Sequence, residues 1–199
     1  MSEKGYKTPD AGRDELKELG ESSLSTEQIF DGTMLKVYRD AVRLPDGGES
    51  VREYIRHPGA VAIIPVDSDG CVLLERQFRF PVDSVCTEIP AGKLNSREED
   101  RLEAAKRELR EETGAVASEW ICLGDFIPAA AYCDERITLF LAQGLSFAGR
   151  DLDEDEFINI FRMPLSEVLA EVLDGKITDA KTQTGIMRAA FALGVTPEK

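Results

Sequence analysis

Histidine and paired cysteines are scarce in this sequence. His57 is the single histidine, and the four cysteines are scattered without a Cys-x-x-Cys pair. A zinc site needs several such ligands close together and a disulfide framework needs a dense set of cysteines, so we expect neither. With one histidine and no nucleophilic serine arrangement, covalent catalysis has no support either. We interpret His57 as structural and the cysteines as reduced, half-buried residues.

Long apolar runs are also missing. The opening segment MSEKGYKTPDAGRDELKELG contains no apolar stretch of the kind found in secretory signals, and no segment is apolar enough to span a membrane. At 199 residues the chain is long enough for one ordinary domain with an additional subdomain. We therefore expect a soluble, cytoplasmic protein without a membrane partner.

Positive charge is scarce relative to negative charge. The chain has 24 lysines and arginines against 38 aspartates and glutamates, which gives a net charge of −14. Because such a chain repels a phosphate backbone at long range, a nucleic-acid polymer is a poor candidate partner. A small anionic substrate would need local compensation, either from a bound metal ion or from arginines that face it.

The order of expected elements indicates an α+β fold. Alternating apolar residues flank two turns, LPDGGE and DSDG, and they recur in the segments WICLGDFIP, RITLFLAQGL and FINIFRM. These patterns are typical of β-strands, and the two turns predict hairpins. Residues 1–57 comprise a polar arm followed by strands, and we expect them to form a separate subdomain. Residues 58–199 then form the main domain.

Three helices are expected in the main domain. The longest runs from about Glu99 to Thr113 and is ended by Gly114, a residue suited to the C-terminal cap. Two more are expected at Leu165–Leu173 and from about Asp179 to Leu193.

Three glutamates gather on one turn of the longest helix. At about 100° per residue, Glu108, Glu111 and Glu112 share one side, while the apolar residues share another. Like charges spaced four residues apart repel by about 0.2–0.5 kcal/mol. For an isolated pair, a solvated acidic face is the simpler interpretation. The alternative is a site for a hard divalent cation such as Mg²⁺ or Mn²⁺, which carboxylate oxygens and water hold.

The end of this helix resembles a known motif. RELREETGA, residues 107–115, is similar to the closing part of the Nudix box, Arg-Glu-U-x-Glu-Glu-x-Gly-U, where U is apolar. In that family the box is a loop-helix-loop whose glutamates bind the metal that activates pyrophosphate hydrolysis. The resemblance implies a Nudix fold for residues 58–199, with a mixed β-sheet sandwiched between helices, and an antiparallel β subdomain for residues 1–57.

The opening part of the box is one residue longer than the family pattern. That pattern places its first glycine six positions before a glutamate, which in turn lies eight positions before the arginine. Counting back from Arg107 gives Glu99, which is one residue too far from Gly92, whereas Glu98 fits the glycine but not the arginine. One residue has therefore been added to the loop KLNSRE. The helix is unchanged, so we expect metal binding to be retained.

Stretches around the box resemble the ADP-ribose and nucleoside-diphosphate-sugar pyrophosphatase branch of the family. They include YIRHPGAVAIIPV, LLERQFRFPVDSVCTEIPAGK and YCDERITLFLA. The implied reaction is metal-dependent hydrolysis of the diphosphate bond of ADP-ribose, or of another nucleoside diphosphate sugar, to a nucleoside monophosphate and a sugar phosphate. Ala130 and Ala131 stand where ADP-ribose members have Pro-Gly, so another nucleotide sugar is equally compatible. The alternatives are a non-catalytic sensor of such ligands and a hydrolase of dinucleotide polyphosphates or capped RNA.

The resemblance also assigns metal-binding and catalytic residues. Glu154, in the late acidic loop DLDEDEF, is expected to be the base, although a solvated acidic turn is an alternative interpretation of that loop. Glu111 and Arg107 complete the catalytic set, and the arginine would orient a carboxylate that holds metal. The expected ligands of Mg²⁺ or Mn²⁺ are the backbone carbonyl of Ala91 and the side chains of Glu108, Glu112 and Glu156.

Three further residues, Arg79, Arg56 and Glu88, are assigned to substrate binding. Arg79 matches an arginine that contacts substrate phosphate in the family, a task that suits a guanidinium group. The alternative is a strand arginine that pairs with a neighbouring carboxylate. Glu88 is assigned as a supporting residue of the same site.

The resemblance and the sequence together predict a homodimer. This enzyme branch is commonly dimeric with exchange of an N-terminal subdomain, and an isolated two-stranded hairpin is marginally stable by itself. We expect Ile29 to His57 of one chain to supply part of the substrate pocket of the other.

Overall fold

The computed structural model describes residues 13–148 and 157–198. Its elements divide into two compact units. The first unit runs to His57 and also includes Ala129–Glu135, while the second comprises Pro58–Pro128 and the chain from Arg136 onward. Within the described residues, every helix is too short or too polar to cross a membrane.

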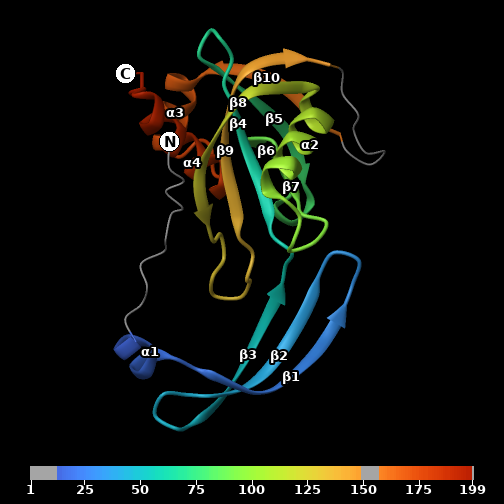
Figure 1. The fold of residues 1–199 in the computed structure, drawn as a ribbon, viewed down its shortest axis with the longest axis vertical. Coiled ribbons are helices and arrows are strands. Elements are labelled where there is room, and N and C mark those ends of the chain that lie inside the picture. The colour runs from blue at the N-terminus through green and yellow to red at the C-terminus, as the bar shows by residue number, and fades with distance from the viewer. Residues whose placement is uncertain (1–12, 149–156, 199) are drawn as a thin grey trace. The chain divides into compact units, whose positions relative to one another are not determined.

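The first unit contains a three-stranded antiparallel sheet in the order β1-β2-β3 (Figure 1). The hairpin expected around LPDGGE is confirmed, because β2 and β3 pair on either side of it and Gly47 adopts a φ of 86°. The alternating apolar segment that was expected before that turn does not form one continuous strand. A turn closed by the Gly32 N–H on the Leu35 carbonyl, at 2.9 Å, divides it into two strands. The elements are α1 (Arg13–Leu19), β1 (Ser22–Asp31), β2 (Lys36–Arg43) and β3 (Glu49–Arg56).

Ala129–Glu135 joins the first unit through the end of β3. The Ile55 N–H donates to the Tyr132 carbonyl at 2.8 Å, and the His57 N–H donates to Asp134 Oδ1 at 2.7 Å. His57 Nδ1 also lies 3.4 Å from Glu135 Oε1. These contacts support the interpretation of the single histidine as structural.

The second unit contains two sheets, one of four strands in the order β7-β4-β9-β8 and one of three in the order β10-β5-β6. The β4–β9 pair is parallel and the others are antiparallel, so the four-stranded sheet is mixed. The strands are β4 (Ala60–Pro65), β5 (Cys71–Arg79), β6 (Ser84–Glu88), β7 (Ala91–Lys93), β8 (Ala115–Phe126), β9 (Ile137–Phe147) and β10 (Asn159–Pro164), with the 3₁₀ turn η1 (Phe80–Val82).

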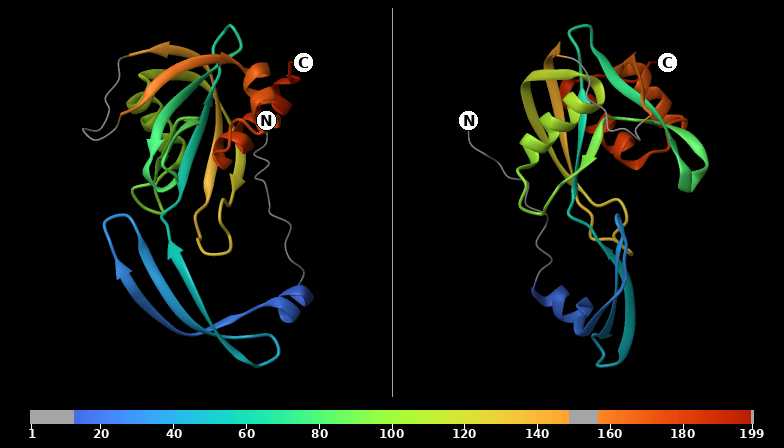
Figure 2. Two further views of the ribbon diagram at one scale, coloured as in Figure 1. Left: turned by 180° about the vertical axis from the view of Figure 1, so that it is seen from behind. Right: turned by 90° about the vertical axis from the view of Figure 1, so that its right-hand side faces the viewer.

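Helices cover both faces of the mixed sheet. Figure 2 shows α2 (Arg101–Thr113) on one face, and α3 (Leu165–Leu173) and α4 (Ala180–Leu193) on the other. All six residues of β4 are buried because alternate side chains point to the two faces. Val61 and Ile63 pack in the core under α2, whereas Ala62 and Ile64 pack in the core under α3 and α4.

The helix α2 has a defined cap at each end. The side chain of Asp100 accepts the N–H groups of Leu102 and Glu103, both at 2.9 Å, so the helix begins two residues later than expected. Gly114 ends it with a φ of 72°, as predicted, and its N–H bonds the Arg110 carbonyl. Such caps fix the first and last turns, and the three glutamates lie in the last two turns.

Candidate active site

Two of the three helix glutamates lie against the short strand β7. The N–H of Ala91 donates to Glu112 Oε2 at 3.0 Å, and Glu112 is only 5% exposed. The Glu108 carboxyl lies so close to the next residue that a Cβ on Gly92 would be 1.9 Å from Glu108 Cδ. Only glycine leaves room for that carboxylate, so the structure brings together three of the predicted positions, Ala91, Glu108 and Glu112.

Arg107 lies among the acidic residues of the same helix. Its Nη1 is 2.7 Å from Glu108 Oε1 and 3.0 Å from Glu111 Oε2, and its Nη2 is 3.5 Å from Glu99 Oε1. Burial favours the neutral guanidine, but Glu108 and Glu111 outweigh this effect and raise the pKa of Arg107. The arginine therefore offsets the mutual repulsion of the glutamates and fixes two of their carboxylates.

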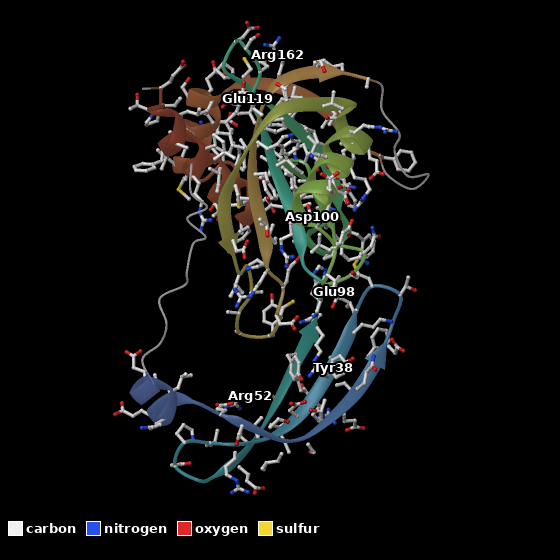
Figure 3. The ribbon with its side chains drawn as sticks, viewed as in Figure 1. Tyr38, Arg52, Glu98, Asp100, Glu119 and Arg162 are labelled. Carbon is white, nitrogen blue, oxygen red and sulfur yellow. The ribbon has the colours of Figure 1, made fainter. Side chains whose placement is uncertain are left out.

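Glu99, rather than Glu98, is the loop glutamate that contacts Arg107. Glu99 lies against Arg107 and also accepts the backbone N–H of Asn95 across the loop. The Glu98 N–H instead bonds Ser96 Oγ at 3.3 Å, in the exposed part of the loop before α2 (Figure 3). The additional residue therefore lies between Gly92 and Glu99, upstream of the helix.

Arg79 and Glu88, which were assigned to substrate binding, bind each other. Nε of Arg79 lies 2.8 Å from Oε1 of Glu88, and Nη2 of Arg79 lies 2.8 Å from Oε2. This is the pairing named as the alternative for a strand arginine. The bond to Glu88 is the largest cause of a raised pKa of Arg79, although the arginine side chain is still 41% exposed.

Glu88, on β6, is buried among charged residues of β5 and of the start of α4. It is 2% exposed, and it lies opposite Glu75, which is 1% exposed, in the register of β5 and β6. Lys181 Nζ contacts Glu88 Oε2 and lies 3.2 Å from Asp179 Oδ2. Burial alone would raise the pKa of Glu88, but Arg79 and Lys181 outweigh it and hold this pKa below its usual value. Glu88 is therefore ionised and held in one position.

Sequence reasoning assigned no role to the residues at the start of α4. Asp179, Lys181 and Thr182 belong to the segment DAKT, in which an aspartate precedes a helix and a threonine follows three positions later. The Thr182 N–H donates to Asp179 Oδ2 at 2.9 Å, so the aspartate caps the helix. That spacing could have identified the cap, but it could not have shown that Lys181 contacts Glu88, 93 positions away in the sequence.

Arg56, also assigned to substrate binding, belongs to the first unit. Its guanidinium carbon lies 4.6 Å from the ring centroid of Tyr38 and 5.6 Å from that of Tyr54. The two rings are stacked, with centroids 5.9 Å apart, and Figure 3 labels Tyr38 on this sheet. Arg56 thus forms part of a flat surface of cationic and aromatic groups. The remaining two predicted site residues, Glu154 and Glu156, lie outside the described residues.

The oxygen ligands near β7 suit a hard divalent cation. Glu108 and Glu112 offer carboxylate oxygens next to the backbone of Ala91, and Gly92 leaves the space between that strand and the helix open to a carboxylate. No three His, Cys, Asp or Glu side chains converge on a metal-sized position among residues 13–148 and 157–198. Mg²⁺ is usually held by one or two carboxylates, with water and substrate phosphate as the other ligands. The residues present therefore fit such a cation.

A separate cavity of about 430 Å³ lies elsewhere in the second unit. The turn between β4 and β5, the strands β8 and β9, and Arg162 of β10 line it, and Figure 3 labels Glu119 and Arg162 there. Arg162 Nη2 lies 2.7 Å from Asp67 and 2.8 Å from Asp69, so its charge is already matched. This cavity does not include the glutamates of α2.

Two glutamates of α2 lie against β7, a glycine-containing strand of the mixed sheet, and helices cover both faces of this sheet. This arrangement defines a class of protein. Residues 56–182 match the model of the NUDIX domain, and the chain belongs to the Nudix family.

Similar proteins define the class further. The chain is 40% identical over 173 residues to the ADP-ribose pyrophosphatase of Bacillus subtilis (strain 168). The aligned residues cover 86% of this chain and 93% of that protein. The chain is 41% identical over 164 residues to the methanol dehydrogenase activator of Bacillus methanolicus, with 81% and 88% covered. A solved structure described as an ADP compounds hydrolase has a TM-score of 0.77 at 23% identity and covers 87% of this chain and 94% of its own, so it has the same fold.

The chain is therefore a Nudix hydrolase with ADP-ribose pyrophosphatase relatives. The predicted family, the α+β Nudix fold with an antiparallel N-terminal sheet, and the enzymatic character are confirmed.

Proposed function

We propose that this enzyme hydrolyses the diphosphate bond of ADP-ribose or another nucleoside diphosphate sugar, with Mg²⁺ or Mn²⁺ as cofactor. The products are a nucleoside monophosphate and a sugar phosphate. The observation that supports this most directly is the approach of Glu108 and Glu112 to Ala91 and Gly92. The substrate class is supported by the relative from Bacillus subtilis, an ADP-ribose pyrophosphatase. A non-catalytic sensor would not require an intact set of glutamates.

The proposed metal ligands are the carbonyl of Ala91 and the carboxylates of Glu108, Glu112 and Glu156. A bound divalent cation stabilises negative charge on phosphoryl oxygens and lowers the pKa of water. Arg107 keeps Glu108 and Glu111 in place through contacts of 2.7 and 3.0 Å. Such contacts to ligand carboxylates orient the ligands, because a carboxylate with a second partner loses rotational freedom.

The proposed base is Glu154. Its carboxylate would take the proton from the attacking water as the new P–O bond forms and the bond to the bridging oxygen breaks. Glu111 belongs to the same catalytic set through its contact with Arg107. Both assignments rest on the resemblance of the late loop and of the helix to the family pattern.

Arg79 is proposed to contact a substrate phosphate from the exposed edge of its guanidinium group. Glu88 uses Nε and one terminal nitrogen, and a guanidinium group has a second terminal nitrogen with two more N–H donors. Because Glu88 is 2% exposed, we propose that it acts on substrate through Arg79. Arg56, over the stacked rings of Tyr38 and Tyr54, is proposed to contact the nucleoside part, since flat cationic surfaces stack on aromatic rings.

A panel of substrates tests the proposed reaction. ADP-ribose, several nucleotide sugars and a dinucleotide polyphosphate are incubated with enzyme, and phosphate is measured after a phosphatase is added, because that phosphatase acts on the monophosphate products. We expect ADP-ribose or another nucleotide sugar to give the highest kcat/KM. Preference for the dinucleotide polyphosphate would contradict the proposed substrate class.

The enzyme is proposed to be a homodimer formed through residues 1–57, with residues 58–199 as the hydrolase domain. In the single chain, every residue of β1 is exposed. Apolar side chains on this sheet are also exposed, among them Leu24 at 45%, Phe30 at 55% and Val51 at 54%. Large apolar side chains exposed on one small sheet are typical of a surface that another chain covers. Ile29 to His57 would then supply part of the partner's substrate pocket.

Light scattering tests this assembly. We expect a particle of twice the 22.0 kDa chain mass, and we expect Phe30→Asp to produce monomers with reduced activity, because it places a charge on the proposed interface. Phe191→Asp is a matched control, since Phe191 is 91% exposed on α4 of the second unit. A wild-type particle that is monomeric at the assay concentration would exclude the dimer.

A further inference from the structure

The start of α4 is bonded to the segment that precedes β7. Thr182 is completely buried, and its Oγ1 accepts the backbone N–H of Ile89 at 3.0 Å. The same hydroxyl donates to Asp179 Oδ2 at 2.6 Å. Because the hydroxyl hydrogen is used in the hydrogen bond to Asp179, a lone pair of Oγ1 accepts the Ile89 N–H. The threonine thus links the capped end of a helix to a backbone N–H two residues before Ala91.

The segment Ile89–Ala91 is fixed at each of its three residues by a different element. Thr182 of α4 holds the Ile89 N–H, the N–H of Ile63 in β4 donates to the Pro90 carbonyl at 2.8 Å, and Glu112 of α2 accepts the Ala91 N–H at 3.0 Å. Peptide planarity leaves two rotatable backbone bonds per residue, and the proline ring fixes one of them. Ile89 is therefore joined to Ala91 through few free torsions, so the position of Ile89 restricts that of the Ala91 N–H, which donates to Glu112.

Close packing supports the hydrogen bond from Thr182. A Cβ on Gly185, one turn further along α4, would lie 2.9 Å from Ile89 Cδ1 and 3.2 Å from Ile64 Cδ1. The helix backbone therefore lies directly against the side chain of Ile89. Residues packed this tightly transmit small displacements, because the interior has little free volume.

We propose that Thr182 is a positioning residue for the metal site. Its hydroxyl, oriented by Asp179, fixes the Ile89 N–H and so sets the position of Ala91, whose N–H orients the carboxylate of Glu112. This inference rests on the proposed function, in which Glu112 and the Ala91 carbonyl hold the cation. It adds α4, on the opposite face of the sheet from α2, to the elements that determine the geometry of the site.

Substitutions at Thr182 can separate its hydroxyl from its volume. Thr182→Val keeps the shape and removes both hydrogen bonds, which leaves the Ile89 N–H and the Asp179 carboxylate without this partner. Thr182→Ser keeps the hydroxyl and removes a methyl group. Thr184 supplies a matched control on the same helix, because its Oγ1 donates to the Ala180 carbonyl at 2.8 Å and its side chain is half-buried, away from Ile89 in the hydrogen-bond pattern.

The experiment measures Mn²⁺ affinity of the full chain by titration calorimetry, together with kcat, KM and thermal unfolding. We expect Thr182→Val to weaken Mn²⁺ binding by about tenfold, the lower end of the effect of residues that support metal ligands. The kcat of this variant should fall together with its Mn²⁺ affinity, while its KM for substrate at saturating Mn²⁺ should change little. Thr182→Ser should recover most of the affinity, and Thr184→Val should bind Mn²⁺ as the wild type does.

Wild-type Mn²⁺ affinity in folded Thr182→Val would overturn this inference, and so would an equal loss of affinity in Thr182→Ser. If Thr182→Val does not fold, Thr182→Ala removes the same hydroxyl without added bulk and gives the same comparison. Failure of the wild type to bind Mn²⁺ would instead refute the proposed metal site. The two failures are thereby distinguished.

Discussion

Glu112→Gln is expected to lower kcat by about 10²–10³-fold, the range seen when one electrostatic contact to the transition state is removed. The amide has the same shape and can still accept the Ala91 N–H, which lies 3.0 Å from Glu112 Oε2. The substitution removes a negative charge that binding of the proposed cation requires. Loss of the repulsion between Glu108 and Glu112 should leave stability unchanged or raise it by about 0.2–0.5 kcal/mol.

The measurements are kcat, KM and the free energy of unfolding of this variant. Glu103→Gln is the matched control, because Glu103 lies on the same helix with its side chain 69% exposed and pairs with Lys106 at 2.7 Å. An exposed pair contributes little, so this control should keep wild-type activity and stability. Wild-type turnover by Glu112→Gln would mean that the active site lies elsewhere.

Removal of divalent metal is expected to abolish activity without unfolding the chain. The acidic turn of α2 suits a hard cation, whereas the two cores of the second unit are built from apolar side chains that pack on one another. Treatment with a chelator followed by desalting should therefore eliminate turnover and leave the circular dichroism spectrum unchanged. Addition of Mg²⁺ or Mn²⁺ should restore the rate. Full turnover after thorough metal removal would refute the proposed cofactor.

The parts of the fold that depend on local sequence could be predicted. Gly114 ends α2 as expected, because its left-handed conformation is available to glycine at little cost, and LPDGGE forms the β2–β3 hairpin. The turn that separates β1 from β2 was missed because apolar residues continue on both sides of Gly32. The inclusion of Ala129–Glu135 in the first unit could not be predicted, since it depends on contacts with Ile55 and His57 from a distant part of the chain.

The candidate site was predictable where one helix determines it. Helical periodicity placed Glu108 and Glu112 on one side, and the structure places both against β7. The bond between Arg79 and Glu88 depends instead on the register of β5 and β6, which composition and spacing do not specify. The choice between Glu98 and Glu99 also required the structure, because only the path of the loop shows which side chain lies against Arg107.

The contact between Glu99 and Arg107 has a consequence for the length of the chain at this point. Glu99 and Asp100 fix the loop where the helix begins, and Gly92 fixes it at β7, while residues 95–98 between them are exposed. Doubling the length of a flexible loop costs only about 0.6 kcal/mol. Residues can therefore be added in this loop at a small cost in free energy, and the exposed positions 96–98, after Asn95, are a suitable place to insert a foreign peptide into this enzyme.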